Sequence, residues 1–212
     1  MSASDPHAGQ PVLTAGPRPI DARLTLVLVH GRGGSAAGML DLTSLLEVED
    51  VAFVAPAAAG QTWYPLSFLA PIPQNEPYLS SALRALENVV TSVESTGVGG
   101  DKIGWIGFSQ GACLTLEFVA RHARRYALVA GLSGGVIGPA GTPRNYAGSL
   151  DGTPVFLGCS DVDAHIPLER VHETTRVYRG LGASVDERIY PGMGHLVSPD
   201  EIRAVRALLA RI

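Results

Sequence analysis

Continuous apolar stretches alternate with helical patterns along this chain, and that alternation is the feature that most restricts its fold. The stretch Leu24–Val29 (LTLVLV) is apolar at nearly every position, which is typical of a strand covered on both faces in a parallel sheet. Further runs, shorter or more polar, follow it. They are Val51–Ala55, Ile103–Ile106, Ala127–Leu132, Pro154–Gly158 and Val185–Tyr190, the last polar enough for a sheet edge.

Amphipathic helical patterns occupy the segments between these runs. The clearest has apolar residues at spacings of three and four between Leu79 and Val93, with Asn75 placed to cap its N-terminus. Similar patterns are found at 36–47, 112–121, 168–178 and 199–209. Strands that alternate with helices form βαβ units, so we predict an α/β fold with a mostly parallel central sheet and helices on both faces.

The chain has the length and composition of one globular domain. Its 212 residues lie near the upper end of the ordinary domain range, and 46% of them are hydrophobic. Residues 1–19 are rich in Ser, Ala, Gly and Pro without periodicity, and we predict a flexible N-terminal arm or a strand too weak to identify. Residues 20–212 then form a single domain, which leaves little room for a separate lid domain.

Charge, cysteine content and hydropathy exclude several classes of protein. A net charge of −4 gives no electrostatic reason to bind nucleic acid, and two cysteines cannot build a disulfide framework. No apolar run is long enough to span a bilayer, and the N-terminus lacks the basic and apolar regions of a secretory signal. We therefore expect a cytoplasmic protein without integral membrane association. The sequence leaves a homodimer open.

The sequence Gly107-Phe108-Ser109-Gln110-Gly111 carries the strongest chemical signal. It fits G-x-S-x-G and lies between a predicted strand and a predicted helix, which is the context of a nucleophile elbow. The tight turn forces the serine into a strained backbone conformation, and the flanking glycines have no side chains to clash there. The hydroxyl then projects above the sheet at a helix N-terminus, where the helix dipole favours negative charge. We predict that Ser109 is a nucleophile.

A serine nucleophile needs a general base, and six histidines are available. His195 lies in the glycine-rich sequence YPGMGH, after the last predicted strand and before the last helix. In α/β-hydrolases the base comes last in the order Ser, Asp, His, so we predict this role for His195. The other five histidines are His7 in the predicted arm, His30 after the first strand, His122 at a helix end, His165 near the candidate acids and His172 on a helix face.

The acid that orients the imidazole is expected in the loop after the run that ends at Gly158. That loop reads CSDVDAHIP, and two aspartates, Asp161 and Asp163, compete for the role. A metal site built from these aspartates with His165 and His195 would remove the acid and the base from the serine. We therefore predict no metal and no cofactor.

A serine that attacks a carbonyl also needs two N–H donors for the oxyanion. The backbone N–H of Gln110, the residue after the serine, is one candidate. The other is expected from the loop His30-Gly31-Arg32-Gly33, where glycines let the backbone approach the substrate, and we assign it to the N–H of Arg32. A phosphate-binding loop at this place would need a Gly-Lys-Ser/Thr ending, which the sequence lacks.

The long segment 56–75 combines aromatic residues with prolines, which is more typical of a pocket wall than of a solvated linker. Long loops in compact domains are usually functional or mobile. We predict that this segment and the loop before His195 supply the substrate pocket. The predicted lining residues are Trp63, Tyr64, Phe68, Leu69 and Met193.

Five segments follow one another as LVLVHGRGG, WYPLSFLAP, GFSQGACL, GCSDVDAHIP and YPGMGH. This combination resembles the phospholipase/carboxylesterase family of α/β-hydrolases, which includes bacterial carboxylesterases, lysophospholipases and acyl-protein thioesterases. The resemblance extends from about Leu24 to Ile212. It implies a triad of Ser109, Asp163 and His195, because the family's aspartate stands four residues before the proline of a D-x-x-x-P pattern.

The resemblance implies a carboxylic ester hydrolase that forms an acyl-enzyme with small-molecule esters of short to medium acyl chains. The sequence differs from acyl-protein thioesterases at Arg32, where they usually have Leu, and at Ala112, where they have Gly. A lysophospholipase or acyl-thioesterase for longer chains is therefore the alternative. A non-catalytic ligand-binding protein is a remote one, because all three triad residues are present.

Overall fold

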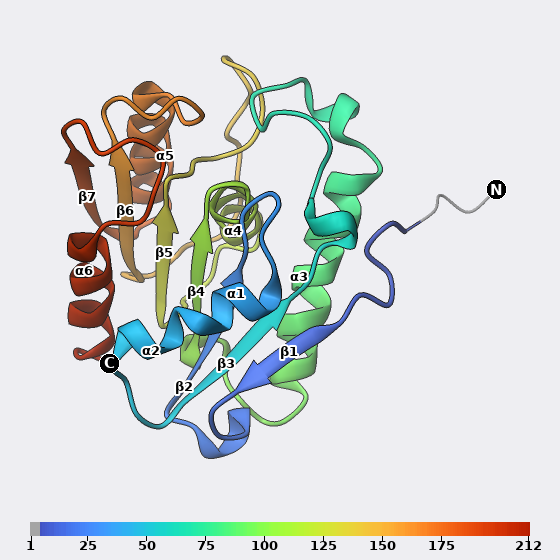
Figure 1. Cartoon of the computed structure of the whole chain (residues 1–212), viewed down its shortest axis with the longest axis vertical. Helices are drawn as coiled ribbons and strands as arrows, with labels where there is room; N and C mark the ends of the chain where they lie inside the picture. The colour runs from blue at the N-terminus through green and yellow to red at the C-terminus, as the bar shows by residue number, and fades with distance from the viewer. Residues whose placement is uncertain (1–4) are drawn as a thin grey trace.

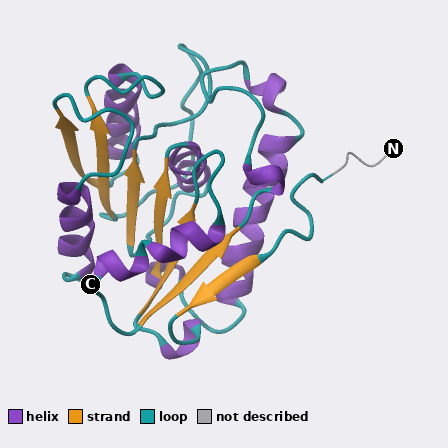
Figure 2. Ribbon diagram, in the orientation of Figure 1, coloured by secondary structure: helices purple, strands orange, loops and turns teal. Residues whose placement is uncertain are grey.

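A seven-stranded sheet forms the centre of the computed structural model, which describes residues 5–212 (Figure 1, Figure 2). The strand order is β1-β3-β2-β4-β5-β6-β7, and every neighbouring pair is parallel except β1 and β3. The more polar β7 lies at an edge, as predicted. The strands are β1 (Val12–Ala15), β2 (Leu24–Val29), β3 (Val51–Pro56), β4 (Ile103–Phe108), β5 (Leu128–Leu132), β6 (Pro154–Ser160) and β7 (Ser184–Tyr190).

Helices cover both faces of this sheet (Figure 1), which confirms the predicted α/β architecture. Helices α1, α2 and α6 lie on one face and α3, α4 and α5 on the other. The single helix expected over 36–47 is divided at Leu42 into two short helices. The helices are α1 (Ala36–Asp41), α2 (Thr43–Leu46), α3 (Tyr78–Glu94), α4 (Gln110–Arg121), α5 (Leu168–Gly180) and α6 (Pro199–Leu209).

Alternating side chains of the central strands fill two separate cores. In β2, Leu24, Leu26 and Leu28 pack beneath α1, α2 and α6, whereas Val27 and Val29 pack beneath α3, α4 and α5. All six residues of this strand are buried. A strand covered on both faces needs apolar residues at nearly every position, which explains why Thr25 is the one polar residue of this run.

Within residues 5–19 the N-terminal segment packs against the domain and contains a strand, so of the two predicted alternatives the structure shows the weak strand and not a flexible arm. Its strand β1 pairs antiparallel with β3 at the sheet edge. Upstream of β1, His7 is only 4% exposed. Its Nε2–H donates to the Trp63 carbonyl (2.9 Å) and its Nδ1 accepts from the Ala59 N–H (3.1 Å). Residues 1–4 of the predicted arm lie outside the described residues.

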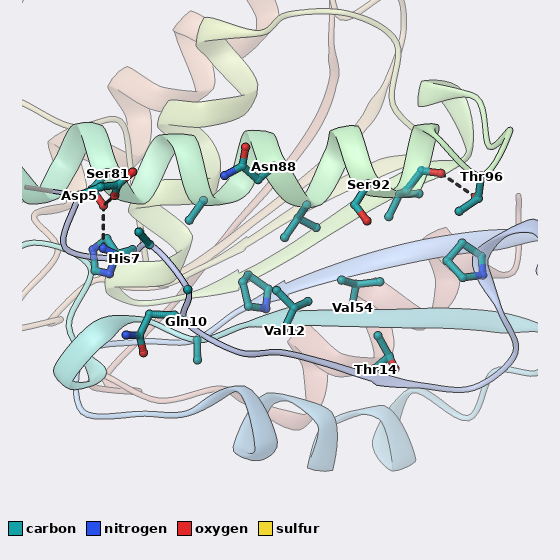
Figure 3. Close-up of a pocket in the computed structure, with 18 residues that line it drawn as sticks. Asp5, His7, Gln10, Val12, Thr14, Val54, Ser81, Asn88, Ser92 and Thr96 are labelled. Atoms are coloured by element: carbon teal, nitrogen blue, oxygen red, sulfur yellow. Dashed lines mark hydrogen bonds between the residues drawn. The ribbon is translucent and has the colours of Figure 1, made fainter.

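A cavity of about 460 Å³ lies between this segment, β3 and α3 (Figure 3). At one end, Ser81 Oγ on α3 accepts a hydrogen bond from the His7 N–H and donates one to the Asp5 carboxylate. These contacts join residues more than 70 positions apart, so no local pattern of the sequence could indicate them. The structure describes all three residues predicted to be catalytic, and none of them lines this cavity.

Asn75 does not cap helix α3, which corrects a second expectation. The helix begins at Tyr78, and Pro77 occupies the N-cap position without a side-chain cap. Asn75 is instead fully buried, and its side-chain amide accepts from the Leu66 N–H (2.8 Å) and donates to the Ser67 carbonyl (3.0 Å). The Asn75 amide therefore binds the backbone of the preceding loop and is not available to cap the helix.

The carboxyl ends of the parallel strands lie together at the upper end of the sheet in Figure 1. The loops after β2, β4, β6 and β7 bring Arg32, Ser109, Asp163 and His195 to this end. Open parallel sheets usually bind their ligands there. Within residues 5–212, no helix combines the length and apolar character needed to cross a membrane.

Replacing His7 with Ala is predicted to lower the free energy of unfolding by about 2 kcal/mol, because a buried carbonyl and a nearby N–H lose their partners. Urea unfolding measures this change. The control is His172→Ala, which removes a half-exposed hydrogen bond to Glu187 and is expected to cost less than about 1 kcal/mol. Equal stability of His7→Ala and the wild type would show that the segment is not packed in solution.

Candidate active site

Ser109 lies at a sharp turn between β4 and α4. Its backbone has φ 54° and ψ −120°, a conformation that L-amino acids rarely adopt. The turn is fixed by the Ser109 N–H, which donates to the Leu132 carbonyl (2.9 Å), and by the Cys113 N–H, which donates to the Ser109 carbonyl (3.0 Å). The surrounding backbone therefore holds the serine in the strained geometry expected of a nucleophile elbow.

Two glycines make this turn sterically feasible. A Cβ on Gly107 would lie 2.6 Å from the Gly111 carbonyl oxygen. A Cβ on Gly111 would lie 2.2 Å from the Val29 carbonyl oxygen and 2.4 Å from that of His30. Any other residue at either position would push helix α4 away from β4 or from the end of β2.

The structure brings the three predicted triad residues into one hydrogen-bonded chain. His195 Nε2 lies 2.8 Å from Ser109 Oγ, and His195 Nδ1 lies 2.7 Å from Asp163 Oδ2. Because a carboxylate only accepts, Nδ1 carries the ring proton and Nε2 presents its lone pair to the hydroxyl. The Asp163 side chain is fully buried, whereas that of His195 is 20% exposed and faces the cavity.

Hydrogen bonds keep the Asp163 carboxylate charged in spite of its burial. Burial by itself would raise the pKa of Asp163, but the hydrogen bond from His195 and those from the N–H groups of His165 and Ile166 outweigh it. The pKa therefore falls below its usual value, and the group is ionised at neutral pH. The Cys159 thiol contacts the same oxygen as His195, at 3.7 Å.

Asp161, the competing aspartate, makes a different contact. Its Oδ1 accepts from the Gly192 N–H (2.8 Å) in the loop that carries His195. It is Asp163 whose carboxylate meets the imidazole, while Asp161 fixes the backbone of the loop. This division of roles could not be derived from the CSDVDAHIP loop alone.

The two predicted oxyanion donors belong to two different elements that adjoin Ser109. Gln110 is the first residue of α4, and an N–H in the first turn of a helix has no partner within that helix. The loop after β2 lies against the serine, because a Cβ on Gly31 would be 3.2 Å from Ser109 Cβ. Within residues 5–212, the next N–H, that of Arg32, donates to no backbone or side-chain acceptor. Both N–H groups are thus free to bind a ligand beside Ser109.

A cavity of about 420 Å³ opens beside Ser109, and no acidic side chain of the described chain lines it. Arg32 is the one arginine or lysine among the described residues that line it, and Asp163 stays hidden behind His195. The lining residues are Arg32, Tyr64, Pro65, Leu66, Ser67, Phe68, Ser109, Gln110, Cys113, His165, Ile166 and His195.

Of the five predicted pocket residues, Tyr64 and Phe68 line this cavity and the other three do not. Trp63 is fully buried behind the wall, where its indole N–H donates to the His30 carbonyl (2.8 Å). Leu69 packs against the hydrophobic core, and Met193 is half-buried in the loop before His195. An aromatic-rich loop must use some of its apolar side chains to anchor itself, and sequence does not indicate which.

Cys113, four residues after Ser109, also lines the cavity, a position that sequence reasoning did not assign to it. It is buried, and burial raises the pKa of its thiol to about 12. At neutral pH the sulfur remains protonated and is a poor nucleophile. Among the described residues of the cavity wall, Cys113 therefore does not compete with Ser109 as the nucleophile.

Three polar side chains near the site were also missed: the guanidinium of Arg32 and the amides of Gln110 and Asn75. Each bonds to the backbone of the loop 63–68, which we call the wall loop. Their residue types are common on protein surfaces, so only the long-range fold reveals what they contact. The sole hint was the unusual density of prolines and aromatics in that loop.

Similarity to a described protein family extends over most of the chain. The family model described as Phospholipase/Carboxylesterase matches residues 17–212. A crystal structure of a phospholipase/carboxylesterase from Dyadobacter fermentans is 40% identical, with a TM-score of 0.92. The match covers 95% of this chain and 97% of that one.

More distant relatives carry names of ester and thioester hydrolases. Acyl-protein thioesterase 1 from Gibberella zeae is 24% identical, over 88% of this chain and 89% of its own length. A probable carboxylesterase, SOBER1-like, from Arabidopsis thaliana is 21% identical, over 89% of this chain and 78% of its own length. With its elbow between β4 and α4 and a family match that begins near β2 and runs to the last residue, this chain belongs to the phospholipase/carboxylesterase family of α/β-hydrolases.

Proposed function

We propose that this protein is a serine carboxylesterase that cleaves small-molecule carboxylic esters through Ser109, His195 and Asp163. The observation that carries the proposal is the unbroken chain of hydrogen bonds from the Ser109 hydroxyl through the imidazole to a buried, ionised carboxylate. The Ser109 end of this hydrogen-bond chain opens into a cavity of the size that small ligands occupy. Family membership supports the same reaction class.

In the acylation step, Ser109 Oγ attacks the ester carbonyl while His195 Nε2 takes the hydroxyl proton. Asp163 holds the ring in the required tautomer and stabilises the imidazolium that forms. The tetrahedral intermediate collapses when the carbon–alkoxide bond breaks and His195 returns the proton to the leaving alcohol. Water, activated by the same imidazole, then attacks the acyl-enzyme and releases the carboxylic acid.

The negative charge of the tetrahedral oxygen is bound by the N–H groups of Gln110 and Arg32. Both are backbone donors, one at the start of α4 and the other in the loop after β2, and donors that are already in place need not reorganise as the charge develops. The N-terminus of α4 adds a favourable dipole at the same point. No cofactor takes part in this scheme.

The size of the cavity favours acyl groups of short to medium length. Its volume is about 420 Å³, and the aromatic ring of Phe68 and the side chain of Ile166 form part of its wall. Relatives named acyl-protein thioesterase make longer acyl chains the second candidate. A cytoplasmic location and a homodimer stay predictions from the sequence.

Replacing Ser109 with Ala should lower kcat for p-nitrophenyl butyrate by about 10³-fold or more, because the nucleophile is lost. Labelling by a fluorophosphonate, detected by intact-mass spectrometry, should disappear as well. Circular dichroism should be unchanged. The matched control is Ser44→Ala, an exposed serine on α2, which should retain full activity and labelling. Retained esterase activity in Ser109→Ala would rule out the mechanism.

Replacing Asp163 with Asn should lower kcat by roughly 10⁴-fold, because a neutral amide no longer fixes the Nδ1–H tautomer. Asp161→Asn removes one charged acceptor from the His195 loop and should cost about tenfold at most. Steady-state kinetics of both variants compare the two positions. A larger loss in Asp161→Asn than in Asp163→Asn would reverse the assignment.

A series of p-nitrophenyl esters separates the two substrate candidates. We expect kcat/KM to be highest between acetyl and octanoyl and to fall for myristoyl and palmitoyl, because a cavity of about 420 Å³ must hold the acyl chain together with the nitrophenyl group. Activity that rises steadily up to palmitoyl would favour the long-chain candidate instead. Ser109→Ala, assayed with each ester, corrects for spontaneous hydrolysis.

A further inference from the structure

We propose that the Arg32 guanidinium is a positioning group that holds the wall loop against the residues that bind the oxyanion. The inference builds on the proposed esterase function. It assigns one residue two separate duties: the backbone N–H of Arg32 faces the reaction, and its side chain fixes the wall of the substrate cavity.

The guanidinium binds three consecutive backbone carbonyls of the wall loop. Its Nη2 donates to the carbonyls of Tyr64 (2.9 Å) and Leu66 (2.8 Å), and its Nη1 donates to that of Pro65 (2.9 Å). Three carbonyls that converge on one cation require a planar group with several diverging N–H bonds. Arginine has five such donors in a rigid fork, which no other side chain offers.

The second oxyanion residue binds the same loop from inside the domain. Gln110 Oε1 accepts from the Trp63 N–H (2.9 Å), and Gln110 Nε2 donates to the Tyr64 carbonyl (2.8 Å). Tyr64 is thus bound simultaneously by the side chains of Arg32 and Gln110. Both residues that we propose as oxyanion donors are tied through their side chains to one short segment.

The wall loop depends on these side chains because its central part lacks regular secondary structure. Residues 64–66 donate to or accept from no backbone group outside the loop, judged over the chain from residue 5 onward. Asn75 binds the Leu66 N–H and the Ser67 carbonyl, and the Gly138 N–H binds the Phe68 carbonyl (2.7 Å). Among these contacts, the Arg32 guanidinium is the only hydrogen-bond donor to the carbonyls of Pro65 and Leu66, so its removal would leave both carbonyls without a partner.

The same three carbonyls also face the positive charge of the Arg32 guanidinium. No carboxylate lies within 4.0 Å of its guanidinium in the described part of the chain. Three carbonyl dipoles converge on it instead, and each presents its negative end. A guanidinium held this way in the cavity wall is already committed to the protein, which favours positioning over direct recognition of an anionic substrate.

The proposed consequence is that the wall loop and the oxyanion loop keep one fixed spacing. When the hydrogen bonds between the Arg32 side chain and the wall loop are lost, the backbone of Arg32 is free to shift. Its N–H then no longer points directly at the tetrahedral oxygen. A displacement of about 1 Å in such a group can cost on the order of 10²-fold in rate. The loss should fall mainly on kcat, since the oxyanion exists only after attack.

The test compares Arg32→Leu and Arg32→Lys with Arg176→Leu, a control at an exposed arginine on α5. For p-nitrophenyl butyrate, Arg32→Leu should lower kcat about 10- to 100-fold with a smaller change in KM. Arg32→Lys keeps the charge but not the fork, so it should recover only part of the loss. Arg176→Leu should match the wild type.

Hydrogen–deuterium exchange gives a readout that needs no activity. In Arg32→Leu, a peptide that covers residues 62–69 should exchange faster than in the wild type and in Arg176→Leu, while peptides from β4 and β5 remain protected. Faster exchange there supports positioning even if no tested ester is turned over, so a failure of the esterase proposal is recognised separately.

Three outcomes would overturn the inference. Unchanged exchange at residues 62–69 in Arg32→Leu would show that the guanidinium does not hold the loop. Full activity in Arg32→Lys would show that a charge suffices without the fork. A loss confined to an anionic ester, such as p-nitrophenyl hemisuccinate, with butyrate unaffected, would assign Arg32 to substrate recognition.

Discussion

The close approach of helix α4 to the end of strand β2 is the constraint on which the site depends. The helix starts so near that strand that a Cβ on Gly111 would meet the Val29 and His30 carbonyl oxygens at 2.2 and 2.4 Å. This contact brings the start of α4, where Gln110 lies, close to the end of β2 and the loop that contains Arg32. The strained backbone at Ser109 is stable because the sheet on one side and the helix on the other leave it no alternative.

Polar side chains, rather than backbone ladders, organise what surrounds that contact. Asp163 is buried yet charged because three donors converge on it. The wall loop has an irregular backbone, and its carbonyls are satisfied by Arg32, Gln110 and Asn75. The Tyr64 carbonyl, which belongs to a buried residue, is bound by both Arg32 and Gln110 and would be costly to bury without a partner. The result is a rigid cavity built from loops, as binding sites often are when a stable sheet supports them.

The sequence predicted the parts of this structure that local patterns encode. The nearly continuous apolar run of Leu24–Val29 predicted a strand covered on both faces. The position of GFSQG between a predicted strand and a predicted helix predicted the nucleophile elbow. Long-range contacts escaped prediction. His7 is buried, and it forms hydrogen bonds with residues more than 50 positions away. Trp63 packs in the core, where its indole binds the distant His30 carbonyl, and not in the cavity wall. The choice of Asp163 over Asp161 needed the family pattern, because both aspartates lie in one loop.

The most direct test of the account is a crystal structure of the protein after reaction with a fluorophosphonate, which mimics the tetrahedral intermediate. The account predicts a phosphorus atom bound to Ser109 Oγ, with its oxygen about 2.7–3.1 Å from the backbone nitrogens of both Gln110 and Arg32. An adduct on another residue would contradict the assignment of the nucleophile. An adduct on Ser109 whose oxygen points away from those two nitrogens would contradict the oxyanion site.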